Sequence, residues 1–177
     1  TKILEVKILH LDVFEDSRGY FYESFNNNKF LDLDLNVNFV QDNISKSKKG
    51  TIRGLHYQVG NFAQGKLCHV ILGSVMDIAV DIRFNSPTFG QYVSVELSDK
   101  NHDSLWIPTG FAHGFEVLSD EAIFSYKCTN VYNKDSERAL IFNDKTINIQ
   151  WSTKNPIVSA KDLLAKSFMD IEKDFIY

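Results

Sequence analysis

The sequence predicts an all-β fold, a β-sandwich or jelly roll with short C-terminal helices. Three observations predict it: apolar residues recur at every second position, tight-turn signals separate about ten short segments, and helical patterns are short. At roughly 150 residues per domain, a chain of 177 residues predicts a single domain spanning residues 1–177.

Alternation and turn residues define the expected elements in order along the chain. A turn of helix is expected at 27–33, and Ser159 is a candidate N-cap for a helix from Ala160 to about Ala165. Asp162 would reach back to the cap as in a capping box, and a helical C-terminal segment is expected at about 159–175. The expected strands are 3–13, 19–25, 37–43, 51–58, 66–73, 75–82, 93–98, 103–107, 111–118 and 121–128.

Composition excludes several classes of protein. The chain carries 23 acidic and 19 basic residues, a net charge of −4, and only four of the cations are arginines, which excludes a generic nucleic-acid binder. Its two cysteines, Cys68 and Cys128, cannot staple a domain of this size and fit a reducing compartment. No apolar run approaches a membrane span, and charges occupy the N-terminal residues where a signal peptide needs apolar ones. We therefore expect a cytoplasmic protein without a membrane or nucleic-acid partner. The lysines 46, 48 and 49 are expected in a solvated turn.

Two segments combine polar groups with strand patterns in ways that suggest chemistry. Asp77 and Asp81 share one face of an otherwise apolar strand, which requires water or a barrel lumen on that side. Arg53 and His56 fall on opposite faces under strict alternation, so they share a site only if Gly54 lies in a bulge. Otherwise the segment is an ordinary strand with a surface histidine.

Two further residues have ordinary explanations as well as functional ones. A lysine at a strand start, such as Lys66, commonly extends its ammonium group to solvent at an edge. Tyr126 shares a face with Phe124, which is also the pattern of a core tyrosine.

The turn from Pro108 through Gly110 to His113 resembles the second motif of the cupin superfamily, a group of small jelly rolls. Cupins usually bind a metal through histidines and a glutamate, but here the first motif has Gln58 two residues after His56, and no glutamate follows. Gln58 is a poor ligand for metals that favour imidazole. We therefore expect neither a metal site nor a cofactor.

Taken together, the motifs resemble the dTDP-4-dehydrorhamnose 3,5-epimerase family. The resemblance covers about residues 2–165 and is carried by segments 16–25, 39–43, 52–58, 63–67, 79–83, 86–90, 105–115, 126–127 and 159–162. It implies cofactor-independent inversion at C3 and C5 of a nucleotide-linked 4-keto-6-deoxy sugar, from dTDP-4-keto-6-deoxyglucose to dTDP-4-keto-rhamnose.

The resemblance implies four catalytic residues, and each has the chemistry that the reaction needs. His56 matches the base and Asp162 the carboxylate that orients it. Lys66 matches the donor that stabilises the enolate oxygen at C4. Tyr126 matches the acid on the opposite face of the sugar, since a phenol is protonated at neutral pH.

The resemblance also implies a binding site and an assembly. Arginines suit the pyrophosphate because their forks match phosphate geometry, and Tyr132 matches an aromatic that stacks on the base. Arg18 would come from an N-terminal strand exchanged within a homodimer. The implied substrate-binding residues are Arg18, Glu23, Gln41, Asn43, Arg53, His113, Tyr132, Glu137 and Lys161.

Ile44 and Val131 depart from residues common in the family and are expected at the rim of the site. They leave open a C3-only epimerase, or an enzyme for another nucleotide-linked 4-keto sugar such as a GDP-linked heptose. Two further hypotheses are a non-catalytic sugar-nucleotide-binding jelly roll and a cupin metalloenzyme. The presence of all four catalytic residue types opposes the binding protein, and Gln58 with the missing glutamate opposes the metalloenzyme.

Overall fold

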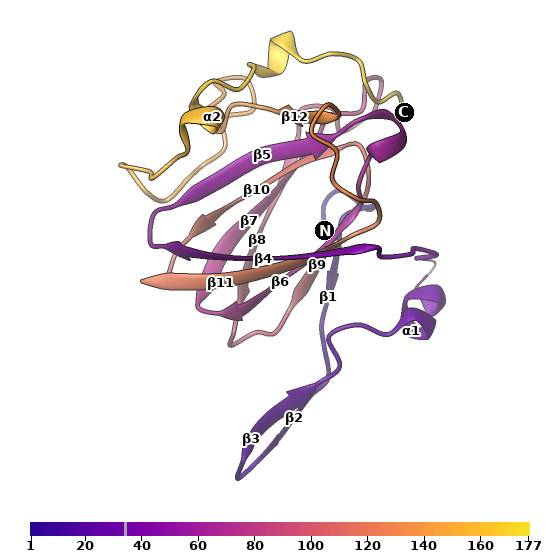
Figure 1. Cartoon of the computed structure of the whole chain (residues 1–177), viewed down its shortest axis with the longest axis vertical. Coiled ribbons are helices and arrows are strands. Elements are labelled where there is room, and N and C mark those ends of the chain that lie inside the picture. Colours follow the sequence, from indigo (N-terminus) through magenta and orange to yellow (C-terminus); the bar gives the residue numbers. More distant parts are fainter. Residues whose placement is uncertain (34) are drawn as a thin grey trace.

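The structure, a computed structural model, describes residues 1–33 and 35–177. Two antiparallel five-stranded sheets face each other as a jelly-roll sandwich, as the sequence predicts (Figure 1). The first sheet has the order β1 (Lys7–Leu9), β9 (Ser104–Ile107), β6 (Lys66–Leu72), β11 (Glu121–Cys128), β4 (Gln41–Lys48). The second has the order β12 (Glu137–Ala139), β5 (Ile52–Gln58), β10 (Phe111–Val117), β7 (Ser74–Asp81), β8 (Tyr92–Ser98).

Alternation along the strands divides the apolar side chains into three packed layers. The inward faces meet between the sheets, where Phe124 and Leu105 are fully buried. The outer face of the second sheet is covered by the C-terminal segment, which brings Ile147 and Phe168 against Ile78. The outer face of the first sheet is partly covered by residues 25–33 and 35–39, which include the short helix α1 (Asn27–Asp32).

Two elements lie outside the sandwich. Within residues 1–33 and 35–177, the strands β2 (Val13–Asp16) and β3 (Gly19–Tyr22) pair only with each other, and their hairpin projects away from the sheets (Figure 1). The helix α2 (Ala160–Leu163) lies on the C-terminal segment beside β5 and β12, and a 3₁₀ turn follows at Phe168–Asp170. No helix within the described residues is long and apolar enough to cross a membrane.

The expected strands differ from the observed ones mainly near the N-terminus. Residues 3–13 do not form one strand, because β1 ends at Leu9 and Val13 opens the separate hairpin. Strand β4 begins later than expected and runs to Lys48, so Lys46 and Lys48 lie on its exposed outward face rather than in a turn. Small inward residues such as Ser45 and Ser47 concealed this strand, since they lack the apolar face that marks one.

Two expectations at the C-terminal end also need correction. Strand β12 is absent from the expected elements, since its three residues are too few to show a period. The helical segment expected at 159–175 reduces to α2 and the single 3₁₀ turn. The rest is irregular because its apolar side chains pack onto the sheet one by one.

A bulge in β5 places Arg53 and His56 on the same side of the sheet, which is the condition for a shared site. Phe115 pairs with Arg53 and His113 with His56, so three residue steps on β5 face two on β10. Gly54 makes this possible with a φ of 127°. Any Cβ at that position would lie 2.5 Å from the Cα of Gly114 on β10.

Replacing Gly54 by alanine is expected to destabilise the fold through both backbone strain and this clash. The positive φ alone costs about 1–3 kcal/mol for a residue with a side chain, and the contact with Gly114 adds to it. Gly60→Ala is the matched control, because Gly60 also has a positive φ, of 61°, but an added Cβ there meets no atom within 4 Å. Urea unfolding of both variants measures the difference. Equal losses of unfolding free energy in the two variants would show that the close approach to Gly114 does not contribute to the destabilisation.

Candidate active site

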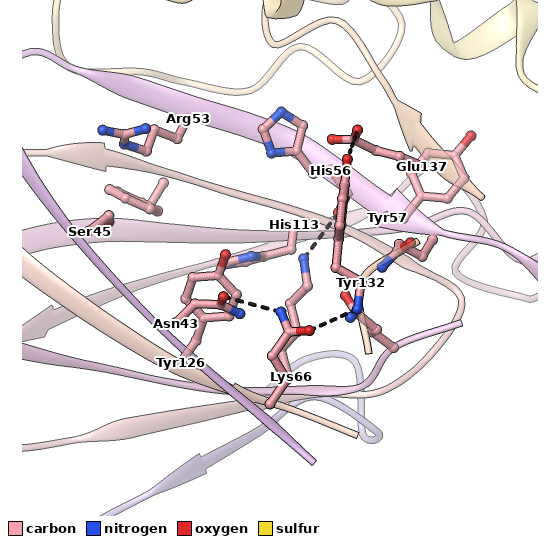
Figure 2. A pocket seen from close by; sticks show the side chains of 14 residues that line it. Asn43, Ser45, Arg53, His56, Tyr57, Lys66, His113, Tyr126, Tyr132 and Glu137 are labelled. Atoms are coloured by element: carbon pink, nitrogen blue, oxygen red, sulfur yellow. Dashed lines mark hydrogen bonds between the residues drawn. The ribbon is translucent and has the colours of Figure 1, made fainter. Parts of the chain in front are cut away.

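A cavity of about 300 Å³ opens between the two sheets (Figure 2). Its walls come from β4, β6 and β11 on one side and from β5, β10 and β12 on the other. The residues that line it are Gln41, Asn43, Ser45, Arg53, His56, Tyr57, Gln58, Gln64, Lys66, His113, Phe115, Tyr126, Tyr132 and Glu137.

His56 and Asp162 form a hydrogen-bonded pair at the edge of this cavity. Their Nε2 and Oδ1 atoms are 2.6 Å apart although 106 residues separate them in sequence. The Asp162 side chain is only 5% exposed and also faces the backbone N–H of Gly54. Burial would raise the pKa of Asp162, but the hydrogen bond and charge of His56 outweigh it and leave this pKa below its ordinary value.

The predicted capping interaction at α2 is half correct. The Ser159 hydroxyl accepts the backbone N–H of Asp162, as expected for an N-cap. The carboxylate of Asp162 does not return the bond to the Ser159 backbone as a capping box requires, because it binds His56 instead. The short helix therefore holds this carboxylate against β5.

Lys66 and Tyr126 reach the cavity from the first sheet. Lys66 is buried rather than at an edge, since β6 lies between β9 and β11, and its Nζ donates to the carbonyl of His56 at 3.3 Å (Figure 2). The ammonium group also lies 5.8 Å from the ring of Tyr126. Burial lowers the pKa of Lys66 and raises the pKa of Tyr126 to about 12. Tyr126 is therefore a phenol, a proton donor, at neutral pH.

His113 binds a second carboxylate at the inner end of the cavity. Its Nε2 lies 2.7 Å from Oδ1 of Asp77, which is fully buried, and 3.7 Å from Sγ of Cys68. Burial lowers the pKa of His113, and the nearby carboxylate of Asp77 opposes this shift. His113 thus gives one oxygen of Asp77 a polar partner inside the sandwich, while its Oδ2 is buried without a partner among the described residues. Asp81 lies at the end of β7, where Arg83, Ser86 and Thr88 bind its carboxylate.

Ligand atoms of Cys68, Asp77 and His113 lie within 4.8 Å of one another, so we tested them as a metal centre. Burial raises the pKa of the Cys68 thiol well above its ordinary value, which opposes the thiolate that a metal needs. The ammonium group of Lys66 is close enough to influence that same thiol and would repel a cation. These residues fit a hydrogen-bonded cluster better than a metal site.

A chain of polar contacts connects β4 with the loop at the cavity mouth. Gln41 donates to Oδ1 of Asn43 and accepts the backbone N–H of Tyr132 (Figure 2). The hydroxyl of Tyr132 donates to Glu137, whose carboxylate also binds Lys161 at 2.5 Å. Burial would raise the pKa of Glu137, but its bonds to Lys161 and Tyr132 outweigh it and lower this pKa. The mouth is therefore held by a charged, hydrogen-bonded chain.

Arg53 lies between the main cavity and a second cavity of about 330 Å³. Both are lined by Arg53 and His56, and the second is also lined by Lys161 and Asp162. The Nε atom of Arg53 donates to the hydroxyl of Ser47 at 2.9 Å, which fixes the guanidinium group. Two cations, Arg53 and Lys161, therefore lie beside the pair formed by His56 and Asp162.

The structure does not bring Arg18 and Glu23 to this site within the chain. Arg18 lies in the projecting hairpin, where its side chain is 88% exposed and binds Asp16. Glu23 binds Asn26 and Lys29 near α1. The remaining predicted site residues each line one of the two cavities.

Ile44 and Val131, which are expected at the rim of the site, line neither of the two cavities. Asn43 and Ser45 face the cavity, so Ile44 between them points outward and is 69% exposed. Val131 is likewise exposed and does not line either cavity. These two departures from the family pattern therefore change neither cavity wall.

Five lining residues are absent from the site predicted from the sequence: Ser45, Tyr57, Gln58, Gln64 and Phe115. Two of them could have been found from the alternation of strands. Ser45 is two residues after Asn43 on β4, and Gln58 is two residues after His56 on β5, so each shares a face with a residue already identified.

Comparison with known proteins identifies the family. A sequence profile described as dTDP-4-dehydrorhamnose 3,5-epimerase matches residues 1–170. A curated dTDP-4-dehydrorhamnose 3,5-epimerase of Shigella flexneri is 53% identical over 173 residues, which cover 97% of this chain and 96% of the relative.

Solved structures agree with this. The chain is similar to a dTDP-6-deoxy-D-glucose-3,5-epimerase of Legionella pneumophila in complex with dTDP-4-keto-L-rhamnose, with a TM-score of 0.96, 46% identity, and coverage of 100% of this chain and 96% of that one. A 3′-monoepimerase of Streptomyces bikiniensis in complex with dTDP-quinovose is more distant, with a TM-score of 0.88, 26% identity, and coverage of 93% and 84%. On this evidence the chain belongs to the dTDP-4-dehydrorhamnose 3,5-epimerase family of isomerases.

Proposed function

We propose that this protein inverts C3 and C5 of dTDP-4-keto-6-deoxyglucose, without a cofactor, to give dTDP-4-keto-rhamnose. One observation carries the proposal. His56 and Tyr126 line the same cavity from opposite sheets, and Lys66 reaches that cavity with its ammonium group beside the His56 carbonyl. A base and an acid on opposite walls are what inversion of a carbon requires.

The proposed chemistry follows from the hydrogen bond between His56 and Asp162. The carboxylate of Asp162 only accepts, so it holds the proton on Nε2 of His56 and leaves Nδ1 as the base. Nδ1 removes the proton next to the ketone, and the C–H electrons move into an enolate with its charge on the C4 oxygen. Asp162 then stabilises the imidazolium, as the carboxylate does in other histidine-carboxylate pairs.

Lys66 and Tyr126 complete the reaction. The buried ammonium of Lys66 stabilises the enolate oxygen, and donors of this kind contribute about 2.7–4 kcal/mol in comparable sites. Tyr126 then gives its proton to the carbon from the other side. The same sequence at the second carbon completes the reaction, once solvent has returned the proton to Tyr126 and taken one from His56.

The remaining predicted residues are proposed to hold the nucleotide. Arg53 and Lys161 line the second cavity beside His56 and Asp162, and their positive charges suit the pyrophosphate. Tyr132 at the mouth is half exposed and available for stacking on the base. The polar side chains that remain for the sugar and nucleoside are Gln41, Asn43, His113 and Glu137.

A homodimer with exchanged hairpins would complete the site. The hairpin projects from the sandwich and exposes Phe14 and Phe21, at 65% and 68%, beside Arg18. Apolar residues exposed around an arginine that is remote from its own cavity support insertion into a second copy. In that arrangement Arg18 and Glu23 would serve the partner's site. The proposed compartment is the cytoplasm, which fits the free thiols of Cys68 and Cys128.

A C3-only reaction, or another nucleotide-linked 4-keto sugar such as a GDP-linked heptose, is the second candidate. The similarity to a 3′-monoepimerase favours it, because that protein shares the fold over 93% of this chain. Inversion at one carbon needs the same base, acid and enolate donor, so the number of exchanged positions decides between them.

Proton exchange in D₂O tests the roles of the base and the acid. Incubated with dTDP-4-keto-6-deoxyglucose and followed by NMR, the wild-type protein is expected to exchange at both C3 and C5. His56→Ala is expected to abolish exchange because no base remains. Tyr126→Phe is expected to keep some exchange and lose net inversion. Normal inversion at both centres by Tyr126→Phe would show that another group is the acid, and exchange at C3 alone in the wild type would favour the second candidate.

Mixing two inactive variants tests the exchanged dimer. Arg18→Ala and His56→Ala are each expected to lose most activity. After joint refolding, about a quarter of the sites would combine an intact His56 with an intact Arg18 from the other chain. Activity should therefore return to about that fraction of the wild-type value. If the mixture stays inactive while gel filtration shows dimers, Arg18 does not act across the interface.

The pKa of Asp162 predicts a pH-dependent contribution to stability. Because folding lowers this pKa, the carboxylate stabilises the fold above its unfolded-state value of about 3.9. That contribution is lost as the pH falls through the lower folded-state value. The difference in unfolding free energy between wild type and Asp162→Asn is therefore expected to shrink from about pH 6 to about pH 3. A difference independent of pH would contradict the charged pairing.

A further inference from the structure

Gln58 is a wall residue of the main cavity, and only one half of its carboxamide is used by the protein. The residue is 5% exposed, and its Oε1 accepts the backbone N–H of Asn133 at 2.8 Å. Among the residues that the structure describes, 1–33 and 35–177, no group accepts a hydrogen bond from its buried Nε2. The carboxamide therefore keeps an unpartnered donor buried in the wall of a ligand-sized cavity.

The orientation of this carboxamide is determined by its neighbour. A backbone N–H needs an acceptor, and only the oxygen of the carboxamide can accept. Turning the group over would place its NH₂ against the N–H of Asn133. Nε2 is therefore the atom of the Gln58 carboxamide without a partner, and its two N–H groups can only donate.

The position of Gln58 relates it to the sugar rather than to the nucleotide. It is two residues after His56 on the same face of β5, which places the two Cα atoms about 7 Å apart. Lys66, which contacts the His56 carbonyl, lines the same cavity. A hexose held with its reacting carbon at His56 spans a similar distance. The carboxamide is also neutral, so it matches an uncharged sugar oxygen better than a phosphate, which a charged group such as Arg53 suits.

We propose that Gln58 is a specificity-determining residue, whose Nε2 donates to a neutral oxygen, hydroxyl or ketone, of the bound hexose. This inference rests on the proposed function for the identity of the sugar nucleotide. It gives a role to the position where a cupin metal site would need a better ligand. At this position the carboxamide of Gln58 donates to a sugar oxygen, and the backbone N–H of Asn133 orients the carboxamide.

Two substitutions separate the free donor from the structural half of the side chain. Gln58→Glu keeps an oxygen for Asn133 and replaces the donor by an acceptor. Gln58→Met removes both hydrogen-bonding groups at similar length. Titration calorimetry with the unreactive sugar nucleotide dTDP-glucose and with dTDP alone reports the contribution of the hexose.

We expect Gln58→Met to weaken the binding of dTDP-glucose about three- to tenfold, and Gln58→Glu to weaken it more. Gln58→Met should leave the affinity for dTDP unchanged, and Gln58→Glu should weaken the binding of dTDP-glucose more than that of dTDP. Gln64→Glu is the control, because Gln64 lines the same cavity but its Nε2 already donates to the carbonyl of Asn130. The charge it introduces should act on both ligands alike.

Equal losses for dTDP and dTDP-glucose would overturn the assignment to the hexose, and unchanged affinity for both would overturn the proposal altogether. Neither measurement requires turnover. If the wild-type protein exchanged no protons in D₂O, the epimerase function would fail while the binding results for Gln58 would still be decisive.

Discussion

The packing of Gly54 against Gly114 is the contact on which the geometry of the site depends. Because no side chain separates the two strands there, β5 can carry one extra residue and turn both Arg53 and His56 toward the cavity. The backbone N–H of Gly54 also faces the carboxylate of Asp162. One local irregularity therefore positions His56, Asp162 and Arg53 together.

Buried charge is the second constraint, and two buried or partly buried carboxylates of the site are each paired with a basic side chain. Asp162 is paired with His56, and Glu137 with Lys161, so each carboxylate keeps its charge inside the protein. Lys66 is different, because its ammonium group donates to a neutral carbonyl at 3.3 Å. In the proposed reaction, an ammonium held in this way is available to the oxygen that becomes negative, and its desolvation has already occurred on folding.

The sequence alone could predict the sandwich and most of its strands, because residues 75–82 and 121–128 alternate regularly and both form strands. The resemblance to the epimerase family also groups His56, Lys66 and Tyr126, which the structure brings to one cavity. The sequence could not place β12, which is too short for periodicity, or Ile44, whose direction depends on the register of β4. Asp77 and His113 are 36 residues apart, and only the pairing of β7 with β10 shows that they meet.

The position of Asp162 on the C-terminal segment has a consequence for the synthesis of the protein. Chains emerge from the ribosome N-terminus first, at about 5–20 residues per second. The strands of both sheets precede residue 140, so they leave the ribosome before the segment that carries α2. Until α2 packs against β5, His56 in the nascent chain lacks the carboxylate of Asp162 as its partner.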